Sequence, residues 1–106
     1  MRAVAVEPSE SPVLSKGVSG KHRIAGIGSG FVPQILNRDA IDEIICVSTM
    51  QAAQTVEILS KTEGVWVGLS SGAAVAAATE LAMRPENKNK TIVTVAPDGG
   101  ERSRLL

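Results

Sequence analysis

Two serines and a glycine stand where a buried strand is expected to pass into a helix. An apolar run, 65–69, precedes Ser70-Ser71-Gly72, and an alanine-rich helix is predicted from Ala73. A helix start offers unpaired N–H groups and a positive partial charge, and ligands of open α/β sheets bind at the carboxyl ends of the strands. The two hydroxyls could therefore contact a ligand. The alternative is that one serine only caps the helix.

Two more segments have residues suited to ligand contact. Gly26, Gly28 and Gly30 alternate along the chain, and alternating glycines allow a ligand to approach the backbone closely. The spacing is not that of a dinucleotide-binding loop, so a simple turn is an equal interpretation. Pro97-Asp98 follows the last predicted strand, and parallel strands would bring it to the same edge as Ser70. Glu101 and Arg102 are expected to form only a surface ion pair.

The single histidine and the single cysteine do not suggest a catalytic pair. His22 lies between two basic residues and is predicted to be a solvated loop residue. Cys46 falls in a predicted buried strand and is read as a core residue. With one residue of each kind, neither an internal disulfide nor a zinc site is expected.

The elements that must position these residues alternate along the chain. Ser48 and Gln51 have the spacing of a capping box, which predicts a helix start, and Gly64 is a natural helix end. Short connections between apolar strands and helices predict an α/β fold with parallel strands, covered on both faces. The predicted strands are 2–6, 43–47, 65–69 and 91–96, and the predicted helices are 49–63 and 73–83.

Length and composition exclude several classes. The 106 residues allow one domain at most, and 11 basic and 11 acidic side chains give zero net charge, which argues against a nucleic-acid binder. No apolar run approaches the ~20 residues of a membrane span, and the first residues are too short an apolar stretch for a signal peptide. A cytoplasmic location is expected. Much of the apolar content is alanine, so the core is expected to be thin.

Five motifs in order resemble the C-terminal part of cysteine synthase (O-acetylserine sulfhydrylase), of the fold-type-II pyridoxal-phosphate family. The resemblance covers nearly the whole chain, 1–106, with no internal domain boundary. It implies the three-layer αβα parallel-sheet fold of the tryptophan synthase β-like type, of which this chain would be the incomplete, C-terminal portion. The motifs are 4–15 (Val-Ala-Val-Glu-Pro-Ser-Glu-Ser-Pro-Val-Leu-Ser), 26–33 (Gly-Ile-Gly-Ser-Gly-Phe-Val-Pro), 68–74 (Gly-Leu-Ser-Ser-Gly-Ala-Ala), 84–87 (Arg-Pro-Glu-Asn) and 100–102 (Gly-Glu-Arg).

The resemblance implies roles for individual residues. Ser70 would hydrogen-bond the pyridine nitrogen of pyridoxal 5'-phosphate, and Gly26, Pro97 and Asp98 would lie beside the cofactor. Gly26, Ile27, Gly28 and Ser29 would line the substrate pocket. The family's Schiff-base lysine, its asparagine-bearing substrate loop and its glycine- and threonine-rich phosphate cup have no counterpart in this chain. No residue here is therefore assigned as catalytic, and no metal site is expected.

The implied parent reaction converts O-acetyl-L-serine and sulfide to L-cysteine and acetate, and the chain alone is expected to be inactive. The family also implies a homodimer and serine acetyltransferase as possible partners. Ala25 stands where cysteine synthases typically have glutamine, and Asp98-Gly99 replaces a more serine-like pair. Three alternatives stay open: a non-catalytic truncated paralogue, a partner-binding remnant, and a fragment like cystathionine β-synthase.

Overall fold

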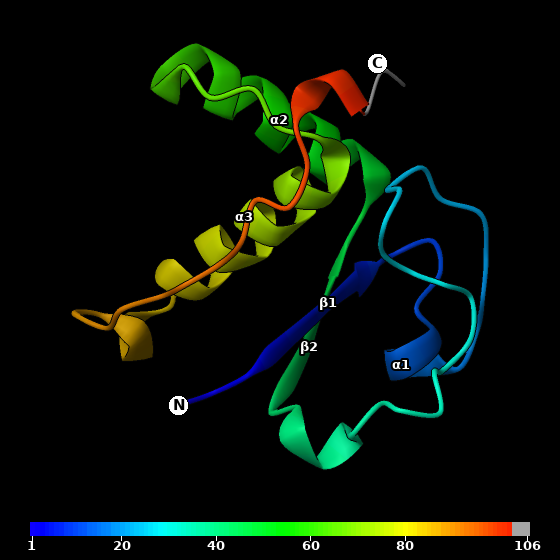
Figure 1. Ribbon diagram of the computed structural model, residues 1–106. Coiled ribbons are helices and arrows are strands. Elements are labelled where there is room, and N and C mark those ends of the chain that lie inside the picture. The colour runs from blue at the N-terminus through cyan, green and yellow to red at the C-terminus, as the bar shows by residue number, and fades with distance from the viewer. Residues whose placement is uncertain (103–106) are drawn as a thin grey trace.

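Two parallel strands form the sheet. The computed structural model describes residues 1–102. Strand β1 (Val4–Pro8) pairs with β2 (Glu43–Val47), in a register that sets Val4 opposite Glu43 and Pro8 opposite Val47. Both strands are short and rich in β-branched residues, as strands that pack on a core require. The prediction of parallel strands in an α/β fold is confirmed (Figure 1).

Helix α2 (Thr49–Glu63) begins and ends where the sequence predicts. The Ser48 hydroxyl accepts the N–H of Gln51 at 3.0 Å, and the Gln51 side chain accepts the N–H of Ser48 at 2.8 Å. The two bonds form the predicted capping box. Gly64 ends the helix in the left-handed conformation, with φ of 67°.

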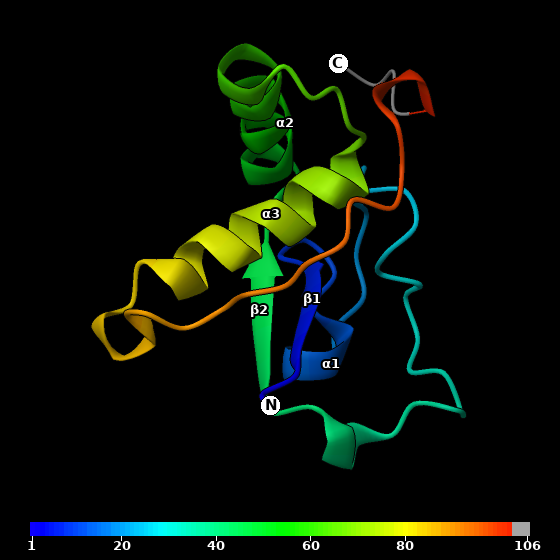
Figure 2. The same ribbon diagram turned by 60° about the vertical axis from the view of Figure 1, so that its left-hand side comes forward.

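Helix α3 (Leu69–Ala82) packs against α2 and against both strands (Figure 2). Gly72 makes the close approach of the helices possible, because a Cβ atom there would lie 2.4 Å from the Ala52 carbonyl oxygen and 2.7 Å from a methyl group of Val56. The core that results is small and partly alanine, as expected. Its buried residues are Ile24, Ile45, Val47, Ala52, Val56, Val67, Leu69, Ala73 and Ala77.

The strands predicted at 65–69 and 91–96 are wrong for this chain. Val67 makes only an isolated antiparallel bridge with Gly99, and α3 already begins at Leu69. Ser70 therefore lies in the first turn of α3, not in a tight turn before a helix that starts at Ala73. Segment 91–96 has the β-branched composition of a strand, but residues 1–102 provide no neighbouring strand for it to bond with, and pairing is what stabilises a strand.

The remaining helices are short: α1 (Val13–Lys16), η1 (Arg38–Ala40), η2 (Pro85–Asn87) and η3 (Gly100–Arg102). The buried carboxylate of Glu7 fixes α1, because it accepts the N–H groups of Leu14 and Ser15 at 2.9 and 3.0 Å. Cys46 is half-buried rather than a core residue, with its Sγ 3.8 Å from Glu7 Oε2. Its thiol faces these polar groups, which the apolar run around it did not indicate.

An ion pair connects the end of α3 to the start of β2. The guanidinium of Arg84 donates two hydrogen bonds to the carboxylate of Glu43, at 2.9 and 2.6 Å, and lies 3.2 Å from Glu80. These hydrogen bonds from Arg84 lower the pKa of Glu43 below its ordinary value. Within residues 1–102, no helix is long and apolar enough to cross a membrane, and no cluster of side chains could hold a metal ion.

Candidate cofactor contact site

Ser70 and Gly26 lie side by side at the start of α3. Ser70 is only 7% exposed, and its hydroxyl has no hydrogen-bonding partner among residues 1–102. Every side-chain oxygen of the described chain that is fully shielded from solvent has a hydrogen-bonding partner. Because the Ser70 hydroxyl has none, it must be partly accessible from outside. A Cβ atom placed on Gly26 would lie 3.9 Å from Oγ of Ser70. The structure thus joins the first two segments singled out in the sequence.

Asp98 lies at the same helix start but contacts the next serine. Its carboxylate accepts the Ser71 N–H at 3.1 Å and the Ser71 hydroxyl at 2.5 Å, and Ser71 is fully buried. Its carbonyl oxygen accepts the N–H of Gly68 at 3.1 Å. Gly68, at the N-cap, has no side chain to offer, so Asp98, 27 residues after Ser71, supplies the capping oxygen. Pro97, next to it, is exposed.

The expected convergence of Asp98 and Ser70 on one edge is found, but for a different reason. The bridge between Val67 and Gly99 is antiparallel, and the Gly100 N–H donates to the Trp66 carbonyl at 3.2 Å. Chain 97–100 therefore folds back along 66–68 and does not emerge from a parallel neighbouring strand.

The residues of the glycine-rich segment 26–30 contact different parts of the molecule. Gly26 alone is found beside Ser70, and its φ of +99° suits glycine. Ile27 packs against the core, and Gly28 lies so close to Pro8 and His22 that an added Cβ would sit 2.6 Å from a ring carbon of that proline. The Ser29 hydroxyl donates to the carbonyl of Phe31 at 3.0 Å, within its own loop. Of the four predicted pocket residues, Gly26 is therefore the one in direct proximity to the unpartnered hydroxyl.

His22 supports this segment and is not the solvated loop residue predicted from its basic neighbours. It is half-buried, its Nδ1 accepts the Ile24 N–H at 3.1 Å, and its Nε2 lies 2.9 Å from the Gly28 carbonyl oxygen. Because Nδ1 accepts, the proton belongs on Nε2, which donates to Gly28. The imidazole thus fixes the curvature of the chain on both sides of Gly26. No local pattern around His22 indicates this contact.

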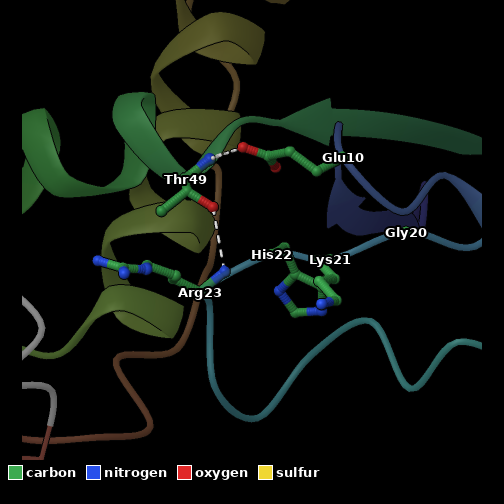
Figure 3. A pocket seen from close by; sticks show the side chains of 6 residues that line it. All are labelled: Glu10, Gly20, Lys21, His22, Arg23 and Thr49. Atoms are coloured by element: carbon green, nitrogen blue, oxygen red, sulfur yellow. Dashed lines mark hydrogen bonds between the residues drawn. The ribbon is translucent and has the colours of Figure 1, made fainter.

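A separate open cavity of about 630 Å³ lies at the start of α2 (Figure 3). Figure 3 shows Glu10 directed at Thr49, whose N–H it accepts at 2.9 Å, while the Thr49 hydroxyl accepts the Arg23 N–H at 3.2 Å. Burial raises the pKa of Glu10, but several lowering causes, of which the backbone hydrogen bond from Thr49 is the largest, together leave the pKa below its ordinary value. The helix start therefore already holds a carboxylate. The cavity is lined by Glu10, Gly20, Lys21, His22, Arg23 and Thr49.

Comparison with known proteins shows which family this chain resembles. Residues 1–98 match the family model of the pyridoxal-phosphate dependent enzymes. Cysteine synthase of Buchnera aphidicola is 46% identical over 106 residues, a match that covers 94% of this chain and 33% of that protein. The crystal structure of Entamoeba histolytica cysteine synthase superposes with a TM-score of 0.93 at 44% identity, over 95% of this chain and 30% of that chain.

A third similar structure is the O-acetylserine dependent cystathionine beta-synthase of Helicobacter pylori, with a TM-score of 0.83 at 36% identity, over 96% of this chain and 33% of that one. The chain thus spans about a third of the length of the relatives that it matches. The chain belongs to the family of pyridoxal-phosphate dependent enzymes.

Proposed function

We propose that this chain provides the ring-nitrogen contact for pyridoxal 5'-phosphate in a cysteine synthase. The observation that carries the proposal is the hydroxyl of Ser70, a residue that is 7% exposed, which has no hydrogen-bonding partner in residues 1–102 and lies beside Gly26. A hydroxyl can donate to a neutral ring nitrogen or accept from a protonated one. The residues present fit this part of the cofactor.

The bound cofactor would supply an electron sink for a carbanion at the substrate's α-carbon. Ser70, a neutral group, does not hold the ring nitrogen protonated as a carboxylate would, so it sets a weaker sink. Asp98 positions Ser70 indirectly, since it caps the turn of α3 through Ser71. Gly26, which lacks a side chain, leaves room for a flat ring next to that hydroxyl.

The activity proposed for the complete enzyme is the conversion of O-acetyl-L-serine and sulfide to L-cysteine and acetate. The chain contains no counterpart of the family's Schiff-base lysine or phosphate cup, so we expect it to produce no cysteine by itself. A homodimer and a complex with serine acetyltransferase are proposed for the complete enzyme as well. Ala25, exposed and apolar where the family has glutamine, is expected to weaken the latter.

A chimera tests the proposal. The part of the Buchnera aphidicola cysteine synthase that matches this chain is replaced by this chain, and cysteine formation and the visible absorbance of the cofactor are measured. We expect activity, and a large loss with a shifted absorbance in Ser70→Ala. Ser29→Ala is the control, because that hydroxyl contacts only its own loop. A chimera that binds the cofactor and forms cysteine equally well with Ser70→Ala contradicts the role of Ser70.

The similarity to the Helicobacter pylori enzyme supports a second candidate, a cystathionine β-synthase activity. The same chimera distinguishes the two when homocysteine is offered in place of sulfide. Preferential formation of cystathionine would favour the second candidate. If the chimera is folded and inactive with both acceptors, the chain is a non-catalytic paralogue or a partner-binding remnant.

A further inference from the structure

The imidazole of His22 uses both of its nitrogens to hold the glycine-rich segment. Nδ1 accepts the N–H of Ile24 at 3.1 Å, and Nε2 lies 2.9 Å from the carbonyl oxygen of Gly28. One nitrogen must accept and the other must donate, and only the neutral ring with its proton on Nε2 does both. An imidazolium has a proton on each nitrogen and cannot accept. The bond to Ile24 is therefore available only to the uncharged ring.

Neither partner of the ring has room to move to a new position. The side chain of Ile24 is fully buried in the core, so its backbone cannot turn toward water without exposing that side chain. Gly28 is packed so tightly that an added Cβ would lie 2.7 Å from Nε2 of His22 and 2.6 Å from a ring carbon of Pro8. Protonation would place a new Nδ1 hydrogen against the N–H of Ile24, donor facing donor. The segment must open at Ile24 to remove this conflict.

Gly26, the residue beside Ser70, lies between the two positions that the ring holds. An added Cβ on Gly26 would lie 3.9 Å from Oγ of Ser70. The bond within the turn itself is long, with the N–H of Ile27 3.4 Å from the carbonyl oxygen of Ile24. The bonds from the ring to Ile24 and Gly28 are shorter, at 3.1 and 2.9 Å. We therefore expect the position of Gly26 relative to Ser70 to depend on the ring.

The charged groups around the ring act on it in both directions. One acidic and two basic side chains line the same open cavity as the ring (Figure 3): Glu10, Lys21 and Arg23. Glu10 interacts electrostatically with His22 and favours a positive ring, whereas the two basic side chains oppose one. β1 contributes only the uncharged ring of Pro8. Glu10 stays ionised between about pH 5 and pH 8, since its pKa lies below its ordinary value although burial raises it. Histidine is the side chain that ordinarily changes charge in this range.

We propose that His22 is a positioning residue whose protonation releases the cofactor contact. The neutral ring holds Gly26 beside the Ser70 hydroxyl, and the imidazolium frees Ile24, so that segment 24–28 moves away from the start of α3. The conformational step depends only on the bonds of the ring, whereas its effect on cofactor binding rests on the proposed function. The contact is therefore expected to be assembled near about pH 8 and to open as the pH falls toward about 5.

A pH titration of the full chain by NMR tests the conformational step. His22 is the only histidine, so its ring signals are identified at once. Between about pH 8 and pH 5 the amide signals of Ile24 and Gly26 should shift with the same midpoint as the ring. Exchange of the Ile24 amide, corrected for its intrinsic pH dependence, should become about tenfold faster or more. The amide of Val56, in the buried face of α2, should not respond. A ring that becomes protonated while the amides of Ile24 and Gly26 keep their signals overturns the proposal.

Two variants separate the effect of the proton from that of the side chain. In His22→Asn the side-chain oxygen can accept the N–H two residues on, as in an Asx turn, and the amide does not titrate. Its Ile24 amide should therefore keep the same signal from about pH 8 to pH 5. Lys21→Gln removes a neighbouring charge but leaves the ring, and should retain the pH-dependent change. A change that persists in His22→Asn would belong to another group and would also overturn the proposal.

The chimera with the Buchnera aphidicola enzyme tests the consequence for the cofactor. Its affinity for pyridoxal 5'-phosphate is measured from the visible absorbance at about pH 8 and about pH 5.5. The affinity should fall about tenfold more in the parent chimera than in its His22→Asn variant, and an equal fall contradicts the proposal. If the full chain shows the coupled change but the chimera binds no cofactor at either pH, the proposed function fails and the conformational role of His22 remains supported.

Discussion

The α2–α3 contact and segment 91–96 differ in whether the described residues supply a structural partner. Helices α2 and α3 meet within this chain, at a contact so close that only glycine fits at position 72. Segment 91–96 has a sequence as well suited to a strand as that of β1, and its backbone has no partner within the described residues. Local composition is equally favourable in both regions. The difference teaches that a strand also needs a neighbour, which the described part of the chain provides for β1 and not for 91–96.

Gly72→Ala, at the contact between α2 and α3, should have the largest effect on stability. The new Cβ would meet the Ala52 carbonyl oxygen at 2.4 Å, so the helices must separate. Overpacking costs about 1–3 kcal/mol, and the better helix propensity of alanine returns up to about 1 kcal/mol. Because the contact is with backbone, we expect a net loss of about 2 kcal/mol in the free energy of unfolding, measured by urea denaturation.

Gly64→Ala is the control for that variant. Gly64 has a φ of +67° and no neighbouring atom within 4 Å of an added Cβ, so only backbone strain applies. A cost of about 1 kcal/mol is expected. Equal losses for the two variants would show that the close approach of α2 and α3 contributes nothing beyond glycine's conformational freedom.

Asp98→Ala tests the junction between the two regions. The carboxylate holds the end of the unpaired stretch to the first turn of α3 through Ser71. Loss of a capping side chain costs about 1 kcal/mol, and Asp98→Asn, which keeps an acceptor, should cost less. Thermal unfolding measures both. If alanine and asparagine variants match the parent, the joining of 97–98 to α3 does not depend on this side chain.

The ion pair of Glu43 and Arg84, at the start of β2, makes the stability of the fold depend on pH. The pKa of Glu43 is lowered in the folded chain, chiefly by the hydrogen bonds from Arg84. The stabilisation is therefore present above the ordinary pKa of 4.5 and is lost as the pH falls through the lower folded value. Glu43→Gln should flatten the fall in melting temperature below pH 4.5. Glu57→Gln, in an exposed pair with Lys61, should flatten it less.

Val93→Thr should have the smallest effect, in the region without partners. The side chain is 85% exposed, so its replacement should change the free energy of unfolding by less than about 0.5 kcal/mol. Urea denaturation of the chain alone measures this. A loss near that of Gly72→Ala would mean that segment 91–96 is already part of the folded core.

The sequence predicted the elements whose signals are local. Ser48, Gln51 and Gly64 specify α2 within a few residues, and the apolar run 43–47 indicates β2. It did not predict the start of α3 at Leu69, because the cap is Asp98, which no pattern near Gly68 reveals. It assigned a strand to 91–96 because β-branched residues favour strands, whereas the structure depends on a partner. The proximity of Ser70 and Gly26 followed from resemblance, not from spacing.

The long separation of the paired strands has a consequence for folding order. Val4 and Glu43 are partners 39 positions apart, whereas α2 and α3 follow one another through a short connection. Contacts between distant residues require the closure of a large loop and form slowly, while helices grow quickly. We therefore expect α2 and α3 to dock first and β1 to join late. Pairing of β1 also places the Glu7 carboxylate, which binds the N–H groups of α1. One slow event therefore orders both β1 and α1.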